Sequence, residues 1–179
     1  MTRPVASVIG IAVLLAAIVP DARGEITPDQ VRRAIDQGVA FLRQQQKPDG
    51  SWPDIIRFHG GVTGLCTLAL LNAGAGPDDE KVQRALKYLR KLPPKTTYVV
   101  SLQTMVLCAA EPAIDVNLIN QNVRWLESKQ ILRGPNTGAW AYPDQGTGDN
   151  SNSQFALLAL HEAERVGVTV SARTWRLAK

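Results

Sequence analysis

Histidine and cysteine are scarce: the 179 residues include two of each. This leaves little material for a catalytic zinc site, which needs three converging protein ligands. Charge of one sign is also lacking, since the formal net charge is +4 and no dense basic run occurs. Nucleic acid is therefore not an expected partner. The 45% hydrophobic content is that of a globular chain, which excludes disorder as the main state.

Residues 1–24 have the pattern of a secretory signal peptide. Arg3 precedes a largely apolar stretch over 5–19, Pro20 ends the stretch, and small residues stand just before Glu25. The stretch is shorter than the roughly 20 apolar residues that span a bilayer. We therefore expect export to the periplasm or the extracellular space, with an uncleaved membrane anchor as the alternative.

The remaining residues, 25–179, alternate between two kinds of helical pattern. Amphipathic helices are expected over 28–46, 79–92 and 116–130, and another begins near 171. Helices that are apolar almost all round are expected over 62–73, 98–110 and the first half of 151–166. A helix that is apolar on all sides is buried, whereas an amphipathic one covers a surface. The pattern predicts an all-α protein with inner and outer helices.

The outer helices align with one another as repeats. Phe41-Leu42, Tyr88-Leu89 and Trp125-Leu126 fall at matching places, and we expect the three aromatic rings to be buried equivalently. Repeats of about 40 residues built from two helices are typical of solenoids and closed helical rings. The chain holds about three and a half repeats, which predicts an incomplete ring or crescent.

Two outer helices end in the same motif. Its residues are Gln46, Gly50 and Trp52 after the first helix, and Gln130, Gly138 and Trp140 after the third. Each glutamine can bond backbone at the next helix, each tryptophan can stack over it, and each glycine admits a tight turn. The motif resembles the QW repeat of the squalene-hopene cyclase and protein prenyltransferase superfamily. That resemblance covers about 27–179 and implies a partial or degenerate α/α-toroid.

The residues that perform the chemistry of that superfamily are mostly missing. Where the cyclases have Asp-x-Asp-Asp, the chain has Asp149-Asn150-Ser151-Asn152. Alkene protonation needs a carboxyl poised by neighbouring carboxylates. Asp149 is therefore a weak catalytic candidate, and a helix cap is its alternative role. The Asp, Cys and His pattern that holds zinc in the prenyltransferases is also missing, so we expect no metal and no other cofactor.

Cys66 and Cys108 could form one disulfide in an exported protein. The repeat alignment matches Cys66 with Thr104, one helical turn before Cys108. The two Cα atoms should then lie roughly 10 Å apart, beyond the ~7 Å limit for a disulfide. We expect both thiols to be free.

Polar residues gather at the entrances of the inner helices in the aligned repeats. The candidates for contact with a ligand are His59, Tyr98, Gln103, Asp149 and Gln154. In a ring these entrances face a common mouth, where positive helix ends favour an anionic group. The alternative is that His59 and Asp149 are unrelated loop and cap residues.

Three functions remain open from the sequence. The first is an exported, non-catalytic module that binds a small or lipidic ligand or a protein. The second is a fragment of an isoprenoid cyclase or prenyltransferase-like enzyme, and the third is a carbohydrate-acting enzyme on a helical ring, for which Asp149-Asn150 is the hint. Cyclase cavities hold cations against many aromatic rings, and only Phe155 and Tyr98 are expected to point inward here, which favours binding. The open end of the array offers an apolar face for self-association.

The signal-peptide pattern generates the first prediction. Cleavage after Gly24 should produce a mature amino terminus at Glu25, because small residues occupy positions 22 and 24. Mass spectrometry of the protein exported by its own host measures this terminus. An intact Met1 in the exported fraction would contradict cleavage.

Overall fold

The computed structural model describes residues 26–55, 58–143 and 146–179. The predicted signal segment, 1–24, lies outside them. The described residues form seven helices and no strand, apart from an isolated bridge between Trp140 and Asp149, so the predicted all-α class is confirmed. The helices are α1 (Pro28–Gln45), α2 (Gly61–Asn72), α3 (Glu80–Leu89), α4 (Thr97–Ala110), α5 (Pro112–Lys129), α6 (Asn150–Arg165) and α7 (Ala172–Leu177).

Helix starts follow local side-chain chemistry. Thr27 and Gln30 form the predicted capping box at α1, Asp79 caps α3, and Ser171 caps α7. The starts of α2, α4 and α5 have no side-chain cap, and α5 begins at Pro112 instead of near 116. Proline suits the first helical turn because the amide hydrogen that it lacks would have no partner there.

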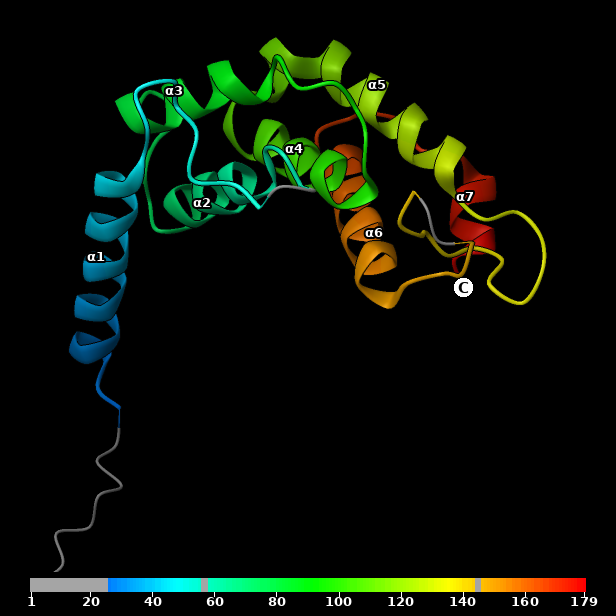
Figure 1. Ribbon diagram of the computed structural model, residues 1–179, viewed down its shortest axis with the longest axis horizontal. Helices are drawn as coiled ribbons and strands as arrows, with labels where there is room; N and C mark the ends of the chain where they lie inside the picture. Colours follow the sequence, from blue (N-terminus) through cyan, green and yellow to red (C-terminus); the bar gives the residue numbers. More distant parts are fainter. Residues whose placement is uncertain (1–25, 56–57, 144–145) are drawn as a thin grey trace, which may run out of the picture.

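The helices form two layers along an arc. Figure 1 shows α3, α5 and α7 following one another along the outer edge, with α2, α4 and α6 on the inside. The central helix is α4, which packs on α2, α5 and α6 and has 10 of its 14 residues buried. Its surroundings explain its composition, because a helix covered on all sides needs no polar face.

The first outer helix departs from the predicted burial. Figure 1 shows α1 standing off one end of the arc, and none of its residues is buried. Phe41 is 59% exposed, so the expectation that it is buried like its counterparts is wrong. Its counterparts Tyr88 and Trp125 are only half-buried. The cause is position: among the helices, α1 packs chiefly on α2 and has no neighbour on its other side.

The end of α1 is closed by the predicted motif. The Gln46 side-chain amide donates to the carbonyl oxygens of Gly50, at 3.1 Å, and Lys81, at 2.8 Å. The indole nitrogen of Trp52 donates to the Leu42 carbonyl oxygen at 2.8 Å. The bonds to Leu42 and Gly50 satisfy carbonyl groups at a helix end and in a turn, and the bond to Lys81 adds a contact to the next helix. The motif thus joins α1, its following loop and the first turn of α3.

The end of α5 carries the same set of contacts. The Gln130 amide donates to the carbonyl oxygens of Gly138, at 3.1 Å, and Thr174, at 3.0 Å. The Trp140 indole nitrogen donates to the Leu126 carbonyl oxygen at 2.7 Å, and the ring is fully buried. Both glutamines also have the same extended backbone conformation. The longer loop before Gly138 therefore leaves the contact geometry unchanged.

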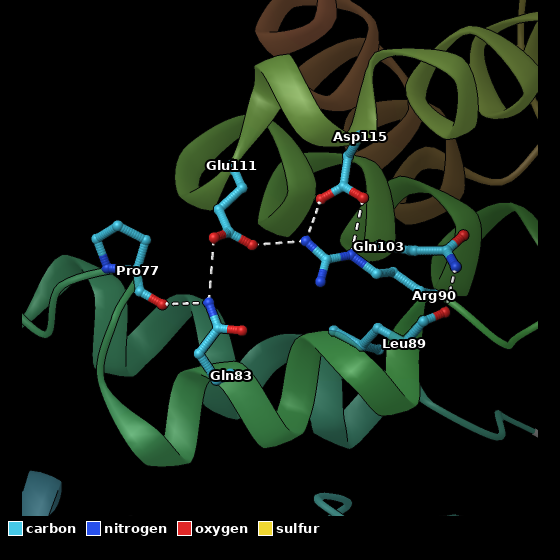
Figure 2. Close-up of polar contacts among 7 residues, drawn as sticks. All are labelled: Pro77, Gln83, Leu89, Arg90, Gln103, Glu111 and Asp115. Carbon is cyan, nitrogen blue, oxygen red and sulfur yellow. Dashed lines mark hydrogen bonds and ion pairs between the residues drawn. The ribbon is translucent and has the colours of Figure 1, made fainter.

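The end of α3, which lacks the motif, is closed from the inner layer. The Gln103 side-chain amide of α4 donates to the Leu89 carbonyl oxygen at 2.6 Å, and its own oxygen accepts from Asn122 of α5 at 2.9 Å. Figure 2 shows Gln103 beside Leu89 at the end of this helix. At α3 a glutamine thus bonds a terminal carbonyl of the helix, whereas at α1 and α5 a tryptophan indole does so.

Polar contacts also join each outer helix to the start of the next. They pair Arg43 with Asp79, Arg90 with Glu111, and Glu127 with the Ser171 amide, each at 2.6 Å. Figure 2 shows the Arg90 guanidinium between Glu111 and Asp115, and the Asp115 side chain is only 5% exposed. In each pair the first residue comes directly after one of the leucines that align in the repeats, which are Leu42, Leu89 and Leu126.

The Gly138 turn generates a stability prediction. A Cβ at Gly138, which has a φ of +91°, would lie 1.7 Å from the Leu177 carbonyl oxygen, whereas Gly134 has a φ of +87° and open space. Gly134→Ala should cost about 1 kcal/mol from left-handed strain alone. Gly138→Ala should cost about 3 kcal/mol, because backbone must also move. Urea unfolding measures both losses, and equal losses would contradict the close packing of α7 on this turn.

Candidate functional site

The five predicted ligand residues lie in different surroundings. Gln103 is 2% exposed and is used at the end of α3. His59 is a surface residue with a side chain that is 72% exposed and an Nδ1 atom 3.6 Å from the Asp54 carboxylate. Gln154 is exposed on α6. Among the described contacts, no hydrogen bond links any two of the five.

Aromatic rings bring the entrances of the inner helices together. Tyr98, in the first turn of α4, packs edge-on against Phe155 of α6 with 4.6 Å between ring centroids. Phe58, just before α2, lies 6.0 Å from Tyr98 and 5.9 Å from Tyr142. Burial raises the pKa of the Tyr98 hydroxyl, which therefore stays protonated at neutral pH. Ring packing thus joins the starts of α2, α4 and α6.

Asp149 is the N-cap of α6, which is the alternative role that the sequence suggested. One oxygen of its carboxylate accepts from the Ser151 hydroxyl, at 2.5 Å, and from the backbone and side-chain nitrogens of Asn152, at 2.7 and 3.0 Å. The bond from Ser151 and the backbone bond from Asn152 lower the pKa of the Asp149 carboxyl. A general acid needs the opposite shift, towards a carboxyl that stays protonated.

An apolar groove runs along the exposed side of α6. Its volume is about 620 Å³, and its walls include Gln154, Leu158, His161 and Trp175. Leu158 is 44% exposed. The Trp175 indole nitrogen donates to the Glu164 carboxylate at 3.0 Å, which places the ring of α7 beside α6. The groove offers apolar surface with a few polar groups at its edges.

Of the groove residues, the sequence pointed only to Gln154. Leu158 and His161 follow it on one side of α6 at spacings of four and three, which is a usable signal. The apolar pattern of α6 hides that signal, because it suggests burial all round.

The two cysteines are free, as predicted. Burial raises the pKa of the Cys108 thiol to about 12, and it also raises the pKa of the Cys66 thiol. A thiolate is the reactive form of cysteine, so neither residue is prepared to act as a nucleophile at neutral pH.

The described residues contain neither a candidate metal centre nor a candidate membrane span. Over the described residues, no group of three or more His, Cys, Asp or Glu side chains could hold a metal ion. None of the helices in the described part of the chain has the length and apolar character needed to cross a membrane.

Comparison with known proteins does not assign this site to a family. No family model, curated protein or solved structure matches the chain. The resemblance to cyclases and prenyltransferases therefore depends on the two Gln, Gly and Trp motifs and on the alternation of helices.

The cap at α6 generates a pH-dependent prediction. Asp149→Ala should lower the free energy of unfolding by about 1 kcal/mol near neutral pH. The folded pKa of Asp149 lies below the unfolded value, so its contribution is present above about pH 4 and is lost as pH falls through the folded pKa. Urea unfolding at several pH values should show the gap between variant and wild type closing in acid.

The control for this cap is Asp36→Ala, at an exposed position on α1. It should change stability by less than about 0.5 kcal/mol at any of these pH values. A gap for Asp149→Ala that stays constant into acid would show that the carboxylate charge does not support the helix.

Proposed function

We propose that the chain is an exported, non-catalytic binding module, and that the α6 groove binds a small or lipidic apolar ligand. The observation that carries the proposal is the groove itself, with its volume of about 620 Å³ and its exposed leucine. Ligand sites typically have about 300–1,000 Å³, mostly apolar walls and a few polar groups, and the groove fits this description. Gln154 and His161 are the groups that would orient the ligand.

The proposed scaffold is a partial α/α-toroid of helix hairpins. Three observations support it: the shared contacts at Gln46 and Gln130, the links between successive outer helices, and the two layers of Figure 1. In such an array each helix pair buries its faces on its neighbours, and the groove lies on the exposed side of the inner helix α6.

Binding is favoured over alkene protonation by the state of Asp149. Its carboxyl has a lowered pKa, because its Oδ1 oxygen accepts three hydrogen bonds that favour the charged form. A proton on the other oxygen would remove the negative charge that strengthens these bonds and would weaken the cap of α6. Alkene protonation would need a protonated Asp149, whereas the cap of α6 is stabilised by the charged form.

The proposal is tested with Nile red, a neutral apolar fluorophore, and two matched variants. Leu158 lines the groove at 44% exposure, and Leu132 lies outside it at 47% exposure. Leu158→Ser should weaken dye binding about fivefold to tenfold, because an apolar wall becomes polar. Leu132→Ser should leave binding unchanged. Fluorescence titration measures affinity, and circular dichroism verifies that both variants are folded.

Two results would overturn the ligand proposal. In the first, both variants weaken binding of the dye equally, which would show that the dye does not bind in the groove. In the second, the wild type fails to bind the dye and sediments as a dimer that Leu158→Ser dissociates. A second copy of the chain would then be what covers α6.

A further inference from the structure

A second cleft lies where the start of α4, the end of α5 and the segment 141–143 meet. It has a volume of about 230 Å³ and contains Lys95, Lys129, Trp125 and Tyr142 in its walls. Thr97, the first residue of α4, also lines it and is 2% exposed. No residue of this cleft lines the α6 groove, so it is a separate feature of the molecule.

The cleft is electropositive on two independent grounds. Two ammonium groups, those of Lys95 and Lys129, line it, and none of its described lining residues is an aspartate or glutamate. The cleft also adjoins the amino-terminal end of α4, a helix of 14 residues whose N-cap, Thr96, makes no side-chain capping bond. Uncapped amide groups at a helix start carry partial positive charge. Both features favour an anion.

Two of the remaining lining residues, Trp125 and Tyr142, are aromatic. The ammonium of Lys129 lies 5.5 Å from the centroid of the Trp125 ring, a cation–π contact that holds the charge beside the indole. Trp125 and Tyr142 are both half-buried, so their rings present apolar surface to the cleft. Its volume is below that of sites for drug-sized ligands, which limits the occupant to about one ring with its substituent.

We infer that this cleft binds an oxyanion carried on a flat ring. The anionic group pairs with Lys95 and Lys129 near the start of α4, and the ring packs against Trp125 and Tyr142. Aromatic carboxylates and aryl phosphates share this chemistry. The inference goes beyond the proposed function and does not depend on it, because the α6 groove takes an uncharged ligand on other residues.

The experiment compares small probes by calorimetry on the full chain. Benzoate and phenyl phosphate carry both the charge and the ring, acetate and inorganic phosphate carry only the charge, and benzyl alcohol carries only the ring. The probes with both features should bind at least about tenfold more tightly than the others. The tighter of benzoate and phenyl phosphate identifies the type of oxyanion.

Variants assign the binding to the cleft. Lys95→Met and Lys129→Met should each weaken the tighter ring-bearing probe about tenfold, since each removes a charged hydrogen-bond donor. Lys47→Met changes an exposed lysine outside the cleft and should have no effect. Raising the salt from about 0.05 M to about 0.5 M should weaken wild-type binding, because part of the affinity is electrostatic.

Each contrary outcome overturns the inference. Absence of binding by both ring-bearing probes, or equal binding of benzyl alcohol, would exclude oxyanion recognition. Equal affinity for inorganic phosphate and phenyl phosphate would show that the aromatic side chains do not contact the ligand. An effect of Lys47→Met equal to that of the cleft variants would show that binding does not take place in the cleft. Should a cleft variant fail to fold, nuclear magnetic resonance of the wild type decides: the Trp125 indole signal must shift during titration with the ring-bearing probe.

Discussion

The arrangement of the two layers depends on how the outer helices end. The last carbonyl groups of a helix have no partner within it, and burying them without hydrogen bonds is costly. At α1 and α5 the indole nitrogens of Trp52 and Trp140 donate to carbonyl oxygens of the last helical turn, those of Leu42 and Leu126. Gln46 and Gln130, at which these helices end, each donate one amide group to a carbonyl oxygen in the following turn and to one in the next outer helix. The motif thereby joins the end of each helix to its neighbour.

The end of α3 shows that this constraint can be met by another route. Its sequence runs into prolines, and a glutamine from the inner layer, Gln103, reaches the Leu89 carbonyl oxygen instead. Arg90 then bonds the nearly buried Asp115, so its removal would leave a carboxylate without its partner in the interior. The polar residues of the inner helices are thus partly structural, which is why polar character alone is a poor guide to a binding site in this fold.

The two candidate sites arise from different features of the scaffold. The α6 groove lies on the exposed side of an inner helix that carries apolar residues such as Leu158 there. The cleft at Lys95 and Lys129 lies where the start of an inner helix meets the end of an outer one. The walls of the groove are mainly apolar and therefore suit an apolar ligand, whereas the cleft combines charge with aromatic side chains and therefore suits an anion.

The sequence by itself determined the features that obey local rules: the alternation of helix types, the cap at Asp149 and the capping box at Thr27. It also predicted the free cysteines and the motif residues, because these depend on spacing along helices. The tertiary structure decided the exposure of Phe41, because the neighbours of a helix are set by packing and not by its own periodicity. It likewise decided both candidate sites, since Trp175 reaches α6 and Tyr142 reaches Lys95 only when segments distant in the chain are brought together.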